Sequence, residues 1–291
     1  MFRNIVKLSA ISAGVVASIA GTVAVVNAKS NCDDLGQKNK RYSFPEADLP
    51  NFKKWNWNWD RLEPGSPGIW PESNKPDEPC SETSGKSVPK ARRNIILVRH
   101  GQYNTDDTDD DKNHTLTALG QEQAALTGQK LNSMGIKFDS ITSSKMIRAI
   151  QTACTMLENM KTQDCLKLEV NDPLLNEGVP TIPEPPYRRP DLWCPEPRDV
   201  LVDGSRIESA FRKYFHRADP SQEKDSWEII VCHGNVIRYF ACRALQFPPE
   251  GWLRISIDHC SIARFTILPT GEVILRGLGD SGHIPYDKAT A

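Results

Sequence analysis

The sequence has almost no net charge, no paired metal-binding cysteines and no unusual excess of hydrophobic residues. Its 36 lysines and arginines face 37 aspartates and glutamates, and this balance gives no support for a nucleic-acid partner, which usually requires a strong basic excess. The eight cysteines include no Cys-x-x-Cys pair, so a zinc or redox motif has no support. A content of 38% hydrophobic and 25% charged residues excludes a collagen-like, a wholly disordered and a polytopic membrane chain.

One charge-free stretch runs from Leu8 to Val26 near the start of the chain. At 1.5 Å per residue, roughly 19 helical residues just cross a hydrocarbon core about 30 Å thick. We therefore expect a membrane anchor at residues 1–29. The alternative is a cleaved secretory signal that ends at Ala28, but several cysteines lie in apolar patterns typical of free thiols, which favours a reducing compartment and the anchor.

Residues 30–93 are predicted to form a tether with little packed structure. Eight prolines lie between residues 45 and 89, a composition typical of linkers. Within the tether, Trp55, Trp57 and Trp59 place three large apolar rings in five residues, and such rings are costly to leave in water. They are expected either to pack on this chain's own domain or to bind a partner, including a second copy.

From residue 94 to residue 291, apolar runs alternate with helical patterns. This alternation predicts an α/β domain with a mainly parallel sheet flanked by helices on both faces. We expect strands near residues 94–98, 138–141, 166–170, 227–231, 262–268 and 272–276, and helices near residues 117–134, 145–159, 203–216 and 235–245.

The residues most suited to catalysis follow the ends of predicted strands. His100 and His233 each follow an apolar strand and precede a glycine, and ligands of open α/β sheets bind beyond the carboxyl ends of the strands. Arg99 and Arg148 are suited to bind a phosphate dianion, and Glu177 lies on a loop. Together they predict phosphoryl transfer through a histidine, with a carboxylic acid that protonates the departing oxygen and no metal or cofactor.

These residues resemble the histidine phosphatase superfamily, which includes phosphoglycerate mutases and acid phosphatases. The resemblance covers about residues 94–284 and implies that His100 is the nucleophile, Glu177 the proton donor, and Arg99, Arg148 and His233 the phosphate ligands. The matching segments are Arg99-His100-Gly101, Thr115–Gly120, Gln123-Ala124, Arg148-Ala149, Gln151-Thr152, Glu177 and His233-Gly234.

Further segments resemble one branch of that superfamily, the mitochondrial phosphoglycerate-mutase-like serine/threonine protein phosphatases. These segments are Gln102-Tyr103, Val236–Tyr239, Ala244–Trp252 and Gly279–Gly282. The branch implies phosphoserine and phosphothreonine proteins as substrates and a single-pass anchor in a mitochondrial membrane, the outer rather than the inner. It also implies a Trp-Asp-x-Asn-Trp-Asp segment that drives homo-oligomerisation, here carried by Trp55, Asn58, Trp59 and Asp60. Asn56 replaces the first acidic residue of that segment.

Two other functions remain open at this stage. The first is a secreted or small-metabolite phosphatase, and the second is an anchored scaffold in which catalysis is secondary. An acidic run at residues 106–111 is expected to be a solvated loop, or else a filter that favours basic substrates. The remaining histidines show no partner pattern and are expected to be structural or on the surface: His114, His216, His259 and His283.

Overall fold

The structure is a computed structural model that describes residues 54–62, 89–105, 111–163, 166–190 and 193–291. The predicted anchor at residues 1–29 and most of the predicted tether lie outside these ranges. Within them, no helix is both long enough and apolar enough to cross a bilayer.

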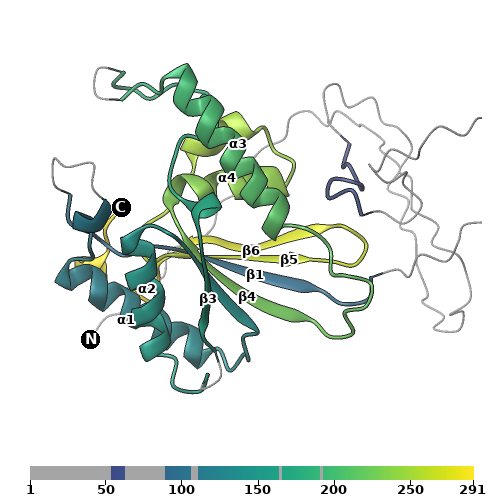
Figure 1. The fold of residues 1–291 in the computed structure, drawn as a ribbon, viewed down its shortest axis with the longest axis horizontal. Helices are drawn as coiled ribbons and strands as arrows, with labels where there is room; N and C mark the ends of the chain where they lie inside the picture. The colour runs from purple at the N-terminus through teal and green to yellow at the C-terminus, as the bar shows by residue number, and fades with distance from the viewer. Residues whose placement is uncertain (1–53, 63–88, 106–110, 164–165, 191–192) are drawn as a thin grey trace, which may run out of the picture. The chain divides into compact units, whose positions relative to one another are not determined.

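A six-stranded sheet in the order β3-β2-β4-β1-β5-β6 forms the centre of the fold (Figure 1). Neighbouring strands run parallel from β3 to β1, whereas β5 and β6 extend the sheet as antiparallel strands. The sheet is therefore mixed, and the predicted parallel part comprises four of its six strands. The strands are β1 Arg93–Arg99, β2 Ser140–Ser144, β3 Leu168–Asp172, β4 Ser226–Cys232, β5 Ile262–Ile267 and β6 Val273–Asp280.

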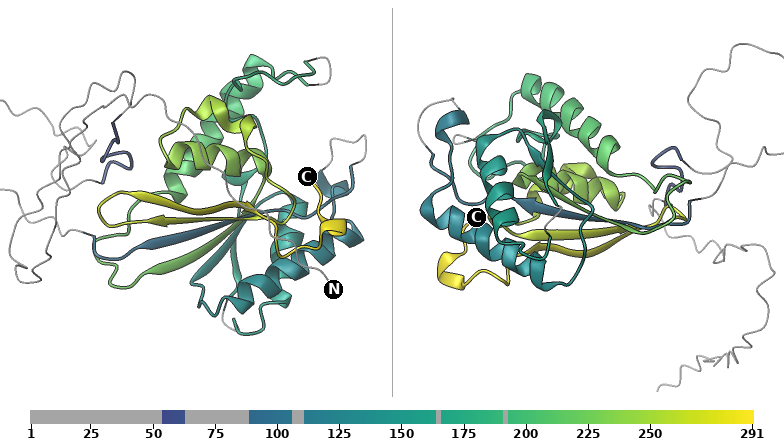
Figure 2. Two further views of the ribbon diagram at one scale, coloured as in Figure 1. Left: turned by 180° about the vertical axis from the view of Figure 1, so that it is seen from behind. Right: turned by 60° about the horizontal axis from the view of Figure 1, so that its bottom comes forward.

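Helices cover both faces of the sheet, α1 and α2 on one face and α3 and α4 on the other (Figure 2). Each pair closes its own hydrophobic core, because the buried residues of β1 and β4 alternate between the two faces. The helices are α1 Ala118–Ser133, α2 Ile147–Glu158, α3 Pro197–Tyr214 and α4 Gly234–Ala244, with 3-10 turns at Asp111–Asn113, Pro173–Leu175, Pro249–Arg254 and Tyr286–Lys288.

Strands β3 and β6 end later than the sequence predicts, at Asp172 and Asp280, and the positions of β2 and α3 also differ, for reasons that the contacts show. Strand β2 extends through Ser143 and Ser144, both fully buried, because their hydroxyls donate to the amide oxygens of Asn171 and Asn176. An apolar run does not reveal a strand that is buried in this way. Helix α3 begins at Pro197 rather than near residue 203, since proline is well suited to the first helical position, where its missing N–H has no helical partner.

Candidate active site

The two strand-end histidines lie side by side. Strands β1 and β4 are adjacent, parallel and in a register that pairs Arg99 with Cys232. His100 and His233 each follow one residue later, and their ring centroids are 5.0 Å apart. Both imidazoles are buried. The parallel sheet thus creates a position at which one tetrahedral anion can contact both rings.

The hydrogen bonds of His100 place its proton on Nδ1 and leave Nε2 unprotonated. Its Nδ1 lies 2.9 Å from the carbonyl oxygen of Gly101, which can only accept, so Nδ1 carries the proton. The Nε–H of Arg148 donates to Nε2 at 3.3 Å. Burial lowers the pKa of His100 well below its ordinary value, and the positive field of His233, Arg148 and Arg99 lowers it further. His100 is therefore a neutral imidazole at pH 7.

Two arginines make the pocket strongly cationic. Arg148 lies in the first turn of α2 and its side chain is buried, with the guanidinium 4.6 Å from the centre of the Tyr103 ring. Arg99 donates through Nη1 to the carbonyl of Ile257 at 2.5 Å. Its Nε is buried, and no atom in the described ranges accepts from it. The pocket thus has cationic hydrogen-bond capacity that an anion could use.

His233 also has unused hydrogen-bonding capacity. The hydroxyl of Ser144 donates to Asn176, so it accepts the Nε2–H of His233 at 2.8 Å. The Nδ1 of His233 is buried and makes no hydrogen bond within the described part of the chain. Helix α4 begins at Gly234, directly after His233, and the positive end of a helix favours negative charge.

Glu177 lies on the loop after β3, and its carboxylate faces the start of α4. Its two oxygens accept from the N–H of Gly178 at 3.1 Å and from the N–H of Asn235 at 3.4 Å. Burial raises the pKa of Glu177, and these hydrogen bonds together with Arg99 and Arg148 only partly offset that rise. A carboxyl group with a raised pKa is suited to donate a proton near neutral pH.

Two charged residues that hold this arrangement together were not predicted to be part of the site. Arg206 of α3 donates to the carbonyls of Leu174, Asn176 and Glu177, and so clamps the loop that carries Glu177. Asp111 accepts from the N–H of Ile147 at 2.8 Å and from Arg148 at 3.1 Å. The last residue of the acidic run is therefore part of the site, whereas residues 106–110 lie outside the described ranges.

Gly101 is required for a backbone contact. A Cβ at this position would lie 2.5 Å from the carbonyl oxygen of Gly120, so the loop after β1 can pack against the start of α1 only without a side chain. For Gly101 the close neighbour is the protein's own backbone, which fixes the position of His100.

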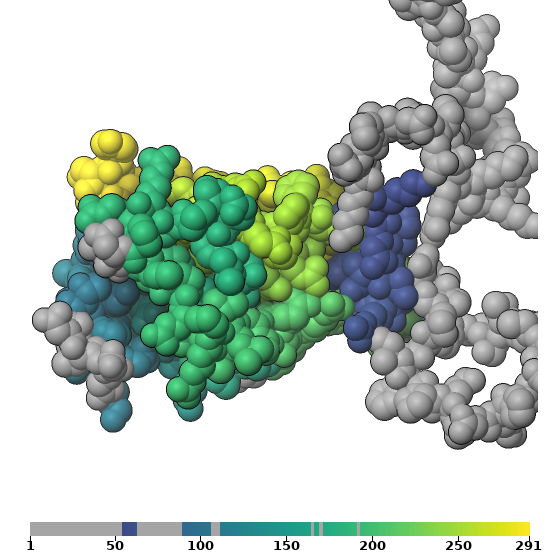
Figure 3. Space-filling model, turned by 90° about the horizontal axis from the view of Figure 1, so that it is seen from above, coloured from purple at the N-terminus to yellow at the C-terminus, as the bar shows by residue number. Residues whose placement is uncertain are grey.

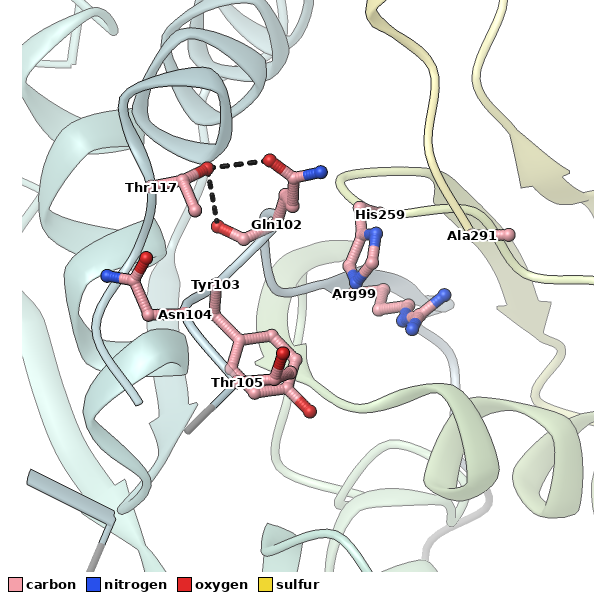
Figure 4. Close-up of a pocket in the computed structure, with 8 residues that line it drawn as sticks. All are labelled: Arg99, Gln102, Tyr103, Asn104, Thr105, Thr117, His259 and Ala291. Atoms are coloured by element: carbon pink, nitrogen blue, oxygen red, sulfur yellow. Dashed lines mark hydrogen bonds between the residues drawn. The ribbon is translucent and has the colours of Figure 1, made fainter. Parts of the chain in front are cut away.

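His259 also lies beside this pocket, a position that the sequence did not indicate. Its ring centroid is 5.4 Å from that of His100. Together with Arg99, Gln102 and Tyr103 it lines a cavity of about 560 Å³. Figure 4 shows Arg99 and His259 on one side of this cavity and Tyr103 on the other. The residue follows no strand or motif, so no local pattern in the sequence reveals it.

The tryptophan segment, residues 54–62, packs on the chain's own domain (Figure 3). Trp59 packs against Phe211, with ring centroids 6.0 Å apart, and its indole N–H donates to the carbonyl of Gly271 at 2.7 Å. Asp60 forms an ion pair with Arg217 at 2.6 Å, and these side chains are 0% and 1% exposed. Of the two expectations for the tryptophans, packing on the same chain is thus observed.

Asn56 retains a hydrogen-bond acceptor where the resembled branch has an acidic residue. Its side-chain oxygen accepts from the N–H of Asn58 at 3.0 Å. Its backbone exchanges two hydrogen bonds with the side chain of Gln246, at 2.8 and 3.0 Å. The amide therefore supports the local turn of the segment without a charge.

A mixed α/β sheet with paired strand-end histidines defines the class, and comparison with known proteins agrees. The model of the histidine phosphatase superfamily, branch 1, matches residues 95–177 and 186–277, and the chain belongs to this family. A phosphoglycerate mutase from Bacillus anthracis covers 68% of this chain and 97% of its own, with a TM-score of 0.50 and 17% identity, which is a likeness of fold alone.

Named relatives match nearly the whole chain. The mitochondrial serine/threonine-protein phosphatase PGAM5 of Rattus norvegicus is 43% identical over 99% of both chains. The corresponding protein of Drosophila grimshawi, also named a mitochondrial serine/threonine-protein phosphatase, is 45% identical over 98% of this chain and 96% of its own. The match therefore includes the N-terminal residues as well as the family domain.

Proposed function

We propose that this chain is a serine/threonine protein phosphatase that works through a phosphohistidine on His100. The observation that carries this proposal is the 5.0 Å separation of the His100 and His233 rings within a pocket formed with Arg99 and Arg148. The names of the nearly full-length relatives support protein substrates.

In the first step, Nε2 of His100 attacks the phosphorus atom in line with the departing serine or threonine oxygen. Nε2 is unprotonated because Nδ1 holds the proton against the Gly101 carbonyl, and its lone pair is freed for attack when Arg148 transfers its Nε–H hydrogen bond from Nε2 to a phosphoryl oxygen. Arg148, Arg99 and His233 neutralise the charge on the equatorial oxygens. A bound dianion favours protonation of His233, whose free Nδ1 then donates to a phosphoryl oxygen.

Glu177 protonates the departing oxygen, since an alkoxide is a poor leaving group at neutral pH. Its raised pKa keeps a fraction of the carboxyl protonated for this task. In the second step the same group, now a carboxylate, takes a proton from water as the water attacks the phosphohistidine. The products are the free hydroxyl and inorganic phosphate, and His100 returns to its starting state.

The substrate class and the intermediate can be tested together on the full chain. We expect turnover of phosphothreonine peptides to exceed that of 3-phosphoglycerate, and rapid quenching followed by mass spectrometry to find phosphate on His100. A phosphoglycerate preference would support the metabolite phosphatase instead. Protein without phosphatase activity that keeps its cellular effects would support the scaffold.

We also propose that the chain is anchored by residues 1–29 in a mitochondrial membrane, the outer rather than the inner, and that it self-associates. The surface that receives Trp59 and Asp60 would then accept the same segment from a second copy, with Trp55 and Asn58 in the same interface. Replacement of Trp55, Trp57 and Trp59 by alanine is expected to lower the mass found by light scattering. An unchanged mass would contradict this role of the segment.

A further inference from the structure

A chain of hydrogen bonds reaches His259 from behind the pocket. The side-chain oxygen of Gln123 accepts from the backbone N–H of Gln102 at 2.9 Å. This contact fixes the orientation of the amide, whose nitrogen then donates to the carbonyl of Lys288 at 2.7 Å and to the hydroxyl of Thr290 at 2.9 Å. The hydroxyl of Thr290 therefore receives one hydrogen bond from Gln123.

The same hydroxyl contacts one ring nitrogen of His259. It lies 2.9 Å from Nδ1 of His259, and after accepting from Gln123 it keeps its own proton and one lone pair, so it can donate to Nδ1 or accept from it. When Thr290 donates this proton, Nδ1 is an acceptor and the imidazole proton is on Nε2. Nε2 is buried and makes no hydrogen bond to any part of the chain that the structure describes.

Backbone hydrogen bonds and a strained backbone conformation fix the position of His259 beside the pocket. The N–H of Cys260 donates to the carbonyl of Arg99 at 3.1 Å and also lies within reach of the carbonyl of His100. Cys260 has a φ of 56°, a left-handed conformation that costs a residue other than glycine about 1–3 kcal/mol. The N–H of His259 also donates to the carbonyl of Thr290 at 2.8 Å.

We propose that His259 is a further phosphate-binding residue, which donates its Nε2–H to an oxygen of the phosphoryl group on the cavity side of His100. The inference rests on the proposed phosphatase function and adds a ligand to it. Burial and the charge of Arg99 lower the pKa of His259 to about 3, so the ring is neutral at pH 7 and contributes a directed N–H without a charge. Thr290 and Gln123 act as positioning residues that hold the tautomer.

Binding of orthovanadate, an analogue of the transferring phosphoryl group, tests the proposal without turnover. With the full chain in a calorimeter, we expect His259→Ala to weaken binding about tenfold to a hundredfold, as for a lost hydrogen bond to a charged group. His259→Gln carries an N–H near the place of Nε2 and should remain within about threefold of wild type. His259→Asn carries its N–H near the place of Nδ1 and should behave as the alanine variant does.

A tautomer measurement and the positioning residue make the test independent of folding defects. Nitrogen NMR of the unmodified protein should show His259 protonated at Nε2 alone. Thr290→Val should mix the two tautomers and weaken vanadate binding, whereas Thr290→Ser should do neither. His216→Ala is the matched control, because that imidazole contacts the carbonyl of Arg217 away from the pocket.

Different outcomes separate this proposal from the proposed function. If wild-type protein binds vanadate and hydrolyses phosphothreonine but His259→Ala binds vanadate equally well, only the role of His259 is wrong. An Nδ1–H tautomer, or a glutamine variant as weak as the alanine variant, would also overturn it. If the wild-type protein neither binds vanadate nor hydrolyses phosphothreonine, the phosphatase function itself fails.

Discussion

The strand-end pocket and the Asp60–Arg217 pair at the tryptophan segment differ in whether their buried polar atoms have hydrogen-bond partners. In the pocket, Arg99, His233 and His259 each keep a buried nitrogen without a partner among the described residues. At the tryptophan segment, both oxygens of Asp60 accept from the guanidinium of Arg217, which also donates to the carbonyl of Trp57. The pocket thus has three buried nitrogens without a partner, whereas the Asp60–Arg217 pair is closely matched, and near this pair only the indole Nε1 of Trp55 has no partner among the described residues.

This difference distinguishes a pocket suited to bind a ligand from an ion pair that stabilises the fold. An unpartnered buried polar atom costs free energy, and a cluster of such atoms beside two strand-end histidines is explained by a bound ion that supplies the missing partners. A buried ion pair with every hydrogen bond made resists the loss of either partner, because the remaining charge would be buried alone. Changes in the pocket should therefore alter activity, and changes at the segment should alter stability.

The largest expected effect comes from removal of the nucleophile. His100→Ala should lower kcat/KM on a phosphothreonine peptide by about 10⁴-fold or more, since the loss of a covalent nucleophile leaves only the contributions of binding and electrostatics. Steady-state assays measure the loss, and His216→Ala serves as the control. Activity at the wild-type level would show that His100 is not the nucleophile.

Loss of the proton donor should depend on the leaving group. Glu177→Gln should lower the rate on phosphothreonine by about 10²–10⁴-fold, the usual contribution of general acid catalysis. The loss on p-nitrophenyl phosphate should be smaller, because that leaving group needs little protonation. Glu184→Gln, an exposed carboxylate on a neighbouring loop, is the matched control. Equal losses on the two substrates would argue against the acid role.

The sequence predicts the residues at the centre of this pocket better than the residues around it. The proximity of His100 and His233 follows from two parallel strands, because their carboxyl ends share one edge of the sheet. Asp111, Arg206 and His259 could not be found in this way. Each reaches the site through contacts between segments distant in sequence, and none belongs to a strand end or a repeated spacing that would mark it.

The same limit applies to the fold. Strands that form continuous apolar runs, such as β1 and β4, lie close to their predicted positions. Strand β2 and the first turns of α3 do not, because hydrogen-bonded serines and a helix-starting proline replace the apolar pattern there. The sequence indicates that the tryptophans pack against another surface but does not show which one. The partner of Asp60 is Arg217, far along the chain, and only the fold brings the two residues together.

Disruption of the Asp60–Arg217 ion pair should release the tryptophan segment and leave the phosphate pocket intact. Asp60→Asn removes the charge that Arg217 faces, and loss of one partner of a buried pair typically costs about 3–5 kcal/mol. We expect faster hydrogen exchange of the Trp59 indole N–H and unchanged vanadate affinity. Asp219→Asn, an exposed carboxylate, is the control. An Asp60→Asn protein with wild-type exchange would show that the pair does not hold the segment.

The smallest effect, a difference in pH dependence, distinguishes the two sites most directly. Burial alone would raise the pKa of Asp60, but Arg217 more than offsets it and lowers the pKa below the ordinary 3.8. Its contribution to stability is therefore present above about pH 3.8 and is lost as the pH falls through the lowered pKa. For Glu177, burial raises the pKa above 4.5, so its contribution is present below about pH 4.5 and is lost as the pH rises through the raised pKa.

The free energy of unfolding, measured in urea from pH 3 to pH 8, should therefore respond to the two substitutions in different pH windows, below about pH 3.8 for Asp60 and above about pH 4.5 for Glu177. Asp60→Asn should flatten the acid side of the profile, because the variant has no charge to lose there. Glu177→Gln should flatten the profile above about pH 4.5, through the raised pKa of the carboxyl group, and leave the protein slightly more stable than wild type at pH 7, since it removes a carboxylate whose charge burial disfavours. If Glu177→Gln instead lowered the stability at pH 7, the Glu177 carboxylate would stabilise the fold. The proposed contrast between the phosphate pocket and the Asp60–Arg217 pair would then be wrong.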